Sequence, residues 1–190
     1  MKRNEKLFVF TLILIATATV CKYFFGPNLA WSGFSPVIAI ALFSGFIFKQ
    51  KNSSFLLPLI ALFASDVIIH ILYTQQLFPY PGFYGGQWIN YLILLSATLI
   101  GWLLKGRTIA TLFAGALVAP TVFFLISNFN VWLGTSEVMY SKDGAGLIKC
   151  YTAALPFYKN ALIATMFFVP SIAIVYNLLT RNKTALKLAA

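Results

Sequence analysis

Two ionisable side chains interrupt one apolar stretch of the sequence and are the first candidates for chemistry. Asp66 and His70 lie in the run from 55 to 73, which is long enough to cross a bilayer. Because they are four residues apart, a helix would carry both on one face. A carboxylate inside a membrane is costly unless it faces a protein interior or a watery cavity. The pair therefore indicates either the lining of a pocket for a polar solute or a hydrogen-bonded fastener between helices.

Three asparagines are expected at a similar depth. Asn90 begins an apolar run, Asn128 ends another, and Asn160 begins the last one. Together with Asp66 and His70, their amides suit an outward-opening pocket that binds a small polar solute through hydrogen bonds. The alternative is that these asparagines satisfy free backbone groups near helix ends.

Aromatic side chains accompany these polar groups near the ends of the apolar runs. Trp88, Tyr84, Tyr151 and Phe157 would stack on a bound solute or close a lid over it. For the tryptophans, Trp88 included, the alternative of an ordinary aromatic belt at the membrane–water interface is favoured.

Catalytic and metal-binding signatures are missing from the sequence. It contains no GxSxG, HExxH, P-loop or GxGxxG motif, and its four carboxylates are dispersed. One histidine and one intramembrane aspartate also make a poor proton relay. Cys21 and Cys150 form no metal-binding pattern, and two separate thiols are favoured over a disulfide between them. We therefore expect no enzyme, no cofactor and no metal site.

The elements that hold these residues follow from the composition, which is 60% hydrophobic and 9% charged. A chain of 190 residues with so much apolar surface is typical of a membrane protein. No small-x-small cleavage site with polar residues follows the first apolar run, so we expect this run to be retained. We predict an all-α membrane protein, a single transmembrane domain over 1–190, with six transmembrane helices at about 7–24, 31–48, 54–73, 88–104, 108–128 and 160–179.

Basic residues set the expected orientation, because they gather at both ends of the chain and after the second and fourth spans. They are Lys2, Arg3, Lys6, Lys49, Lys51, Lys105, Arg107, Arg181, Lys183 and Lys187. By the positive-inside rule, we expect both termini in the cytoplasm and the chain in the cell (inner) membrane. The formal charge of +10 then reflects this topology and attraction to the lipid bilayer. Nucleic acid is not an expected partner, since the basic residues are spread over separate turns.

The same orientation puts the longer connections on the outer face, at 25–30, 74–87 and 129–158. The second contains Pro79, Pro81 and Gly82, so we expect an irregular flap. Long ordered loops carry function more often than tight turns do. We expect the three loops to converge as a lid.

Four segments of the chain resemble a known family. They are FSPVIAIALFSGFIF (34–48), PLIALFASD (58–66), FFLISNFNVWL (123–133) and AGLIKCYTAALPFYKN (145–160). They look like an uncharacterised family of small bacterial six-helix integral membrane proteins. That family in turn resembles the substrate-binding S components of energy-coupling-factor (ECF) vitamin transporters. The resemblance implies an S-component-like bundle that captures a vitamin-like or cofactor-like solute from the outer face.

The resemblance also implies a partner. S components usually dock onto a transmembrane coupling protein that is driven by two cytoplasmic ATPases. They commonly do so through an Ala-rich AxxxA face on the first helix, whereas this chain has LILIATATV at 12–20. The departure leaves a second hypothesis open, in which the protein is a non-transporting membrane scaffold or a subunit of a larger envelope complex.

Overall fold

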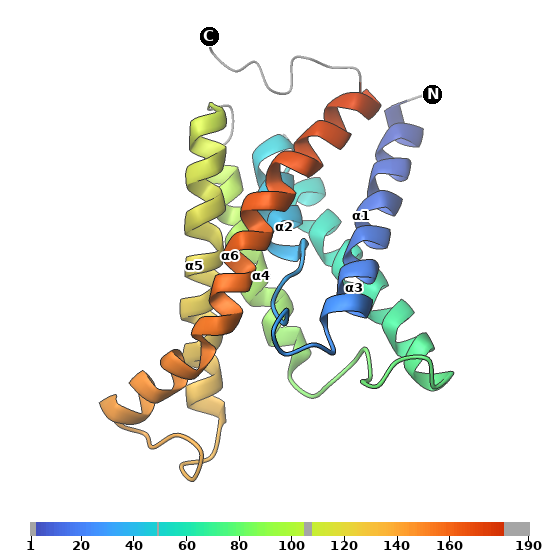
Figure 1. Ribbon diagram of the computed structural model, residues 1–190. Helices are drawn as coiled ribbons and strands as arrows, with labels where there is room; N and C mark the ends of the chain where they lie inside the picture. The colour runs from blue at the N-terminus through green and yellow to red at the C-terminus, as the bar shows by residue number, and fades with distance from the viewer. Residues whose placement is uncertain (1–2, 49, 105–107, 181–190) are drawn as a thin grey trace.

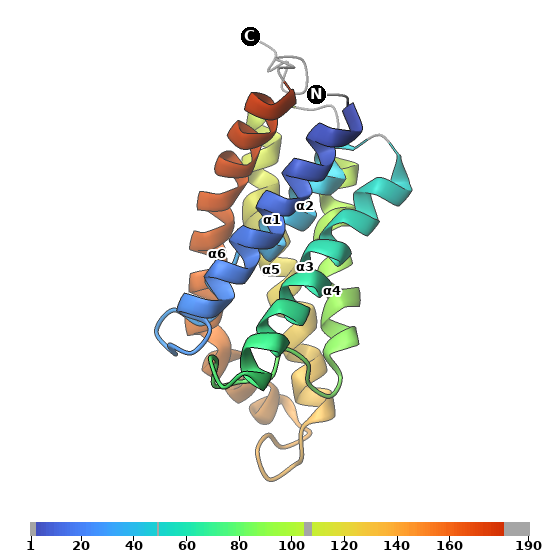
Figure 2. The same cartoon turned by 90° about the vertical axis from the view of Figure 1, so that its right-hand side faces the viewer.

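The computed structural model describes residues 3–48, 50–104 and 108–180, which form six helices and no strand (Figure 1). The first turn of the first helix and the last turn of the sixth lie at the same end of the bundle (Figures 1 and 2). The helices are α1 (Arg3–Phe25), α2 (Val37–Ile47), α3 (Lys51–Thr74), α4 (Gln87–Leu103), α5 (Ile109–Gly134) and α6 (Gly144–Thr180).

Four of these helices, α1, α3, α5 and α6, are long and apolar enough to cross a membrane. With the composition, they indicate a multi-pass membrane protein. The other two helices, α2 and α4, have 11 and 17 residues. At 1.5 Å per residue α2 is only about 16 Å long, roughly half of a bilayer core. The prediction of one continuous helix over 31–48 is therefore wrong, although the four long spans agree with the expected membrane class.

The short helix α2 occupies the centre of the bundle. It packs against α3, α4, α5 and α6, and every residue from Ile38 to Phe46 is buried. Its sequence VIAIALFSGFI has no charged side chain on any face, which is typical of a helix enclosed on all sides. The core of the molecule is therefore built around α2, and α1 covers the bundle from the side of α3 and α6.

The contact between α2 and α4 depends on two glycines. A Cβ atom on Gly45 would lie 2.0 Å from the carbonyl oxygen of Thr98, and one on Gly101 would lie 2.0 Å from that of Leu42. Each glycine thus lets the backbone of the other helix approach closely, as small residues do between membrane helices.

The segment 26–36 explains why α2 is short. It is irregular, although 31–36 was expected to begin a span, and it makes its own turns, such as Trp31 N–H to Asn28 O at 3.0 Å. Gly33 has a φ of +89°, which a helix does not allow, and Pro36 restricts the backbone of the residue before it. The helix therefore begins only at Val37.

The prediction of an outer loop at 129–158 is wrong at both boundaries. Helix α5 continues to Gly134 and α6 already begins at Gly144, so the connection is 135–143. The residues after 144 are apolar enough to extend the helix. Pro156 lies inside it, because a membrane helix tolerates a proline where neighbours satisfy the freed backbone groups. By contrast, 75–86 is irregular as expected for the flap at 74–87.

Side chains close both helix ends at the 135–143 connection. The ammonium group of Lys142 donates to the carbonyl oxygens of Leu133 (3.1 Å) and Thr135 (2.6 Å) at the end of α5. The carboxylate of Asp143 accepts from the backbone N–H of Gly146 at 2.8 Å and so caps the start of α6. That hydrogen bond is the main cause that lowers the pKa of Asp143 below its usual value. The connection is therefore an ordered turn.

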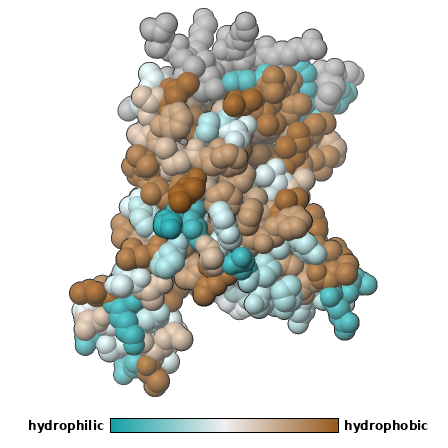
Figure 3. All heavy atoms as spheres, in the orientation of Figure 1, coloured by the Kyte–Doolittle hydropathy of each residue, from teal (hydrophilic) through white to brown (hydrophobic). Residues whose placement is uncertain are grey.

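The visible surface in Figure 3 is mostly apolar over the body of the bundle, and hydrophilic residues are more frequent toward its lower end. This distribution suits a chain whose body contacts lipid. Of the basic residues that set the expected orientation, several lie outside the described residues: Lys2, Lys49, Lys105, Arg107, Arg181, Lys183 and Lys187.

Candidate functional site

A pocket of about 390 Å³ lies between the helices. All six helices contribute to it, and so do the irregular segments 26–36 and 75–86. We call it the central pocket. Its lining consists of Lys22, Gly33, Ser35, Val37, Ile38, Leu62, Asp66, Tyr84, Gln87, Asn90, Tyr91, Leu94, Pro120, Phe123, Phe124, Ser127, Asn128, Phe157, Tyr158 and Ala161.

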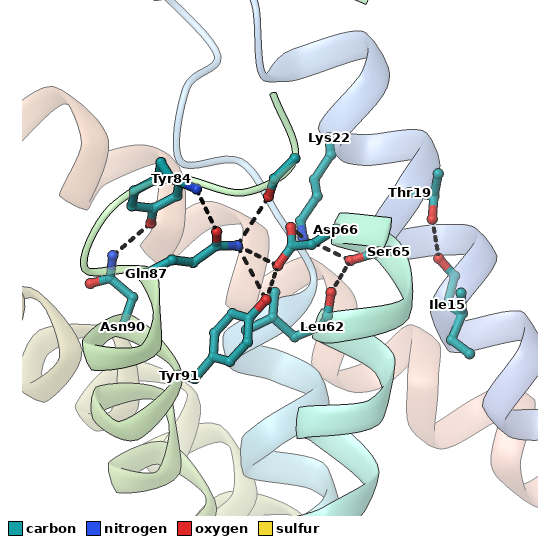
Figure 4. A network of polar contacts seen from close by, with 11 residues as sticks. Ile15, Thr19, Lys22, Leu62, Ser65, Asp66, Tyr84, Gln87, Asn90 and Tyr91 are labelled. Carbon is teal, nitrogen blue, oxygen red and sulfur yellow. Dashed lines mark hydrogen bonds and ion pairs between the residues drawn. The ribbon is translucent and has the colours of Figure 1, made fainter. Parts of the chain in front are cut away.

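One wall of the central pocket is a polar network around Asp66, whose residue surface is 6% exposed. The carboxylate forms an ion pair with Lys22 of α1. Its other oxygen accepts from Gln87 Nε2 at 2.7 Å and from the Tyr91 hydroxyl at 2.5 Å, both on α4. Figure 4 shows these three side chains pointing toward Asp66 from two different helices. Because a buried charge is costly without partners, this arrangement explains how α3 carries a carboxylate at this depth.

The network also holds the segment 75–86 in place. Gln87 Nε2 donates to the carbonyl oxygen of Gly82 at 3.1 Å, and Gln87 Oε1 accepts from the backbone N–H of Tyr84 at 3.0 Å. Asn90 Nδ2 donates to the Tyr84 hydroxyl at 2.7 Å. Gly82 lies so close to α3 that a Cβ atom there would be 2.1 Å from the carbonyl oxygen of Asp66. The flap is therefore closed onto the site (Figure 4).

The other wall is aromatic and comes from α5 and α6. Phe123 and Phe124 face the pocket from α5, and Phe157 and Tyr158 from α6. The rings of Phe124 and Tyr158 have centroids 4.7 Å apart, and the Tyr158 hydroxyl lies 2.9 Å from the Thr121 hydroxyl. The central pocket can thus offer hydrogen bonds on one side and ring contacts on the other.

Five of the nine residues that the sequence suggested do line the central pocket. They are Asp66, Tyr84, Asn90, Asn128 and Phe157. An acid, two amides and two aromatic rings from distant segments of the sequence thus line one pocket. The remaining four lie elsewhere: His70, Trp88, Tyr151 and Asn160.

His70 and Trp88 lie apart from the central pocket. The ring of His70 packs near Phe83, with centroids 5.4 Å apart, and its buried Nδ1 atom has no hydrogen-bond partner among the described residues. Its four-residue spacing from Asp66 does not make the two side chains a pair, since the Asp66 carboxylate is bound to Lys22, Gln87 and Tyr91 instead. Trp88 is 64% exposed, because the adjacent Gln87 takes the inward direction.

Asn160 and Tyr151 instead connect parts of the structure. Asn160 Nδ2 donates to the carbonyl oxygens of Ala30 (2.8 Å) and Ser32 (2.9 Å), which fixes the segment 26–36 to α6. The Tyr151 hydroxyl donates to the carbonyl oxygen of Leu125 at 2.6 Å, which joins α6 to α5. Asn160 therefore satisfies free backbone groups, which is the alternative role that the sequence allowed for the three asparagines.

The substitution Asn160→Asp tests whether Asn160 fixes the segment 26–36, because a carboxylate cannot donate to the two carbonyl oxygens. We expect the free energy of unfolding to fall by about 2 kcal/mol. We also expect backbone amides in 26–36 to exchange hydrogen faster, as measured by mass spectrometry. The matched control is Asn52→Asp, on an exposed position in the first turn of α3, which should change neither quantity. Unchanged exchange in 26–36 would contradict the assignment.

Sequence reasoning missed Lys22 and Gln87 and did not select Tyr91 as a site residue. A signal for Lys22 was present, since a carboxylate in an apolar run predicts a basic partner at similar depth in another run. Lys22 is in the last turn of α1. Gln87 lies at the junction of the flap and α4. The inward direction of its side chain depends on the path of the flap, so the sequence alone did not indicate it.

The cysteines and the metal-ligating residue types give no further site. Cys21 and Cys150 are both free and buried, so the disulfide that was considered is absent. Within the ranges that the structure describes, no three His, Cys, Asp or Glu side chains gather as a metal site would require.

Comparison with known proteins identifies a family and no activity. Neither the curated proteins nor the solved structures contain a match to this chain. A family of unknown function (DUF6580) matches over residues 1–186, which confirms the resemblance to an uncharacterised family. The chain, with its six helices and central pocket, belongs to this family of unknown function.

Proposed function

We propose that this protein is an integral membrane receptor that captures a small vitamin-like or cofactor-like solute from the outer face for uptake. The observation that carries the proposal is the central pocket itself. It joins a polar network on α1, α3 and α4 to an aromatic wall on α5 and α6. Pockets of a few hundred Å³ with an apolar body and a few fixed polar groups are typical of sites for small organic ligands.

The proposal includes an orientation in the membrane. The first turn of α1 and the last turn of α6 lie at one end of the bundle, and the segments 26–36 and 75–86 lie toward the other (Figure 1). If the basic end faces the cytoplasm, the central pocket lies nearer the outer face and the flap covers it from that side. This arrangement supports capture from outside, in the cell (inner) membrane, with six helices in an S-component-like bundle.

A coupling partner is part of the same proposal. The resemblance to S components suggests a transmembrane coupling protein with cytoplasmic ATPases, and α1 has an exposed apolar face that includes Phe8, Leu12 and Val20. That face lacks the AxxxA pattern, so docking would use larger side chains than those of S components.

A scaffold is the second candidate. In its favour, the connection between α5 and α6 exposes apolar side chains, with Val138 98% and Met139 58% exposed. Such a surface suits contact with another protein of the envelope. Five expected site residues nevertheless line one pocket, which favours solute binding over assembly.

The test of the receptor proposal is mass spectrometry of small molecules released from the purified, detergent-solubilised protein. The variant Ala161→Phe places a ring in the central pocket, and Ala153→Phe adds the same ring at an exposed position of α6. We expect one solute per chain in the unchanged protein and in Ala153→Phe, and at least a tenfold loss in Ala161→Phe. Thermal unfolding of both variants checks whether they are folded.

Two results would overturn the proposal. One is the absence of any released solute together with a co-purifying envelope protein, which would favour the scaffold. The other is equal retention in Ala161→Phe and Ala153→Phe, which would place the bound molecule outside the central pocket.

A further inference from the structure

The charges that line the central pocket cancel. Lys22 and Asp66 are its only lysine, arginine, histidine or carboxylate side chains within the part of the chain that the structure describes. They form an ion pair with each other, and their side chains are 21% and 8% exposed. The lining therefore carries no net charge that could balance a charged solute.

Both charges are also already bound by neighbouring groups. The Asp66 carboxylate accepts from Lys22, from Gln87 and from Tyr91. The ammonium group of Lys22 also donates to Ser65 Oγ at 2.7 Å, in addition to its ion pair. A cation entering the pocket would have to displace donors from Asp66, and an anion would have to displace Lys22. Transfer of an uncompensated ion from water into a low-dielectric site is strongly unfavourable.

Uncharged groups, by contrast, have unused hydrogen-bonding capacity. The hydroxyl oxygen of Ser35 is buried and has no hydrogen-bond partner within the described chain, although Ser35 lines the central pocket. It stands just before α2, whose first-turn residues Val37 and Ile38 also line the pocket. Pro36 provides no side-chain cap there, and the first N–H groups of a helix have no intrahelical acceptor. This end of the pocket therefore offers donors to an acceptor atom of the solute.

The aromatic part of the lining favours a ring. Phe123, Phe124 and Phe157 line the pocket from α5 and α6, whereas the network is on α1, α3 and α4. Rings of a bound molecule make favourable contacts with aromatic side chains in offset or edge-on arrangements.

We propose that the solute is uncharged at neutral pH and carries a carbonyl-type acceptor on an aromatic ring. This inference rests on the proposed receptor function and narrows its substrate class. The acceptor is bound at the Ser35 hydroxyl and the first turn of α2, and the ring contacts the aromatic wall. The ion pair of Lys22 and Asp66 shapes the pocket and does not bind a charge of the solute.

The test uses three compounds of nearly equal shape with the purified full chain, after removal of any bound solute. Benzamide is neutral, benzoate is an anion and benzamidine is a cation at pH 7. We expect benzamide to raise the unfolding temperature at millimolar concentration, and to bind at least tenfold more tightly than either ion. The variant Ser35→Ala should weaken benzamide binding about fivefold. Ser32→Ala, whose side chain does not line the pocket, should not change it.

The outcomes separate the two proposals. Tighter binding of benzoate or benzamidine, or a charged molecule among the solutes released from the purified protein, would overturn the charge inference and leave the receptor standing. Equal binding by Ser35→Ala and the unchanged protein would overturn the position of the acceptor. If none of the three compounds binds and no solute is released, both proposals fail.

Discussion

Replacement of Asp66 by asparagine is expected to lower the free energy of unfolding by about 3 kcal/mol, because it leaves Lys22 largely buried without its counter-ion. The amide also accepts less strongly from Gln87 and Tyr91, which both donate to one carboxylate oxygen. Reversible unfolding in detergent, followed by circular dichroism or by loss of helix-protected amides, measures the change.

The double variant Lys22→Gln with Asp66→Asn separates the charge effect from the packing effect. With no unpaired charge, it should recover most of the lost stability. Glu137→Gln, at an exposed position in the connection between α5 and α6, is the control for loss of a carboxylate elsewhere. If the double variant is as unstable as the single one, the ion pair is not the source of the stability.

The substitution Gly101→Ala is expected to have an effect of similar size, also about 3 kcal/mol, for a steric reason. The new Cβ atom would lie 2.0 Å from the carbonyl oxygen of Leu42 and 2.9 Å from the amide nitrogen of Phe46. These are backbone atoms of α2, so no side chain can rotate away and the helices must separate. The thermal unfolding temperature of the purified protein measures this loss.

Gly134→Ala is the matched control, because no atom lies within 4 Å of the position of its Cβ. It should leave the unfolding temperature nearly unchanged. Equal behaviour of Gly101→Ala and Gly134→Ala would contradict a close backbone contact between α2 and α4.

The general architecture could be predicted from the sequence because the length of the apolar runs indicates where long helices form. The runs that became α1, α3 and α5 are long and mostly apolar, and the structure has helices there. Prediction failed where local geometry decided the outcome. Gly33 and Pro36 unwind the beginning of an apolar run, whereas Pro156 is accepted inside α6. Apolarity alone does not distinguish a proline that ends a helix from one that the helix tolerates.

The candidate site could be predicted in part for a related reason. Asp66 was conspicuous because a carboxylate is rare in an apolar run, and the structure surrounds it with partners. Helical spacing alone also suggested His70, but its ring packs near Phe83 of the flap and does not line the central pocket. The position of Gln87 in the network depends on the closure of 75–86 onto α3, which no residue pattern encodes.

The short central helix α2 has a consequence for biosynthesis in the membrane. Neither α2, with its 11 residues, nor the irregular segment before it can be stable alone in lipid, because the backbone groups of 26–36 would lack partners there. Part of their stabilisation comes from Asn160, which follows them by more than a hundred residues. The ribosome therefore synthesises the segment 26–47 long before α6, the helix that carries Asn160. We therefore expect the final insertion of 26–47 to follow the synthesis of α6.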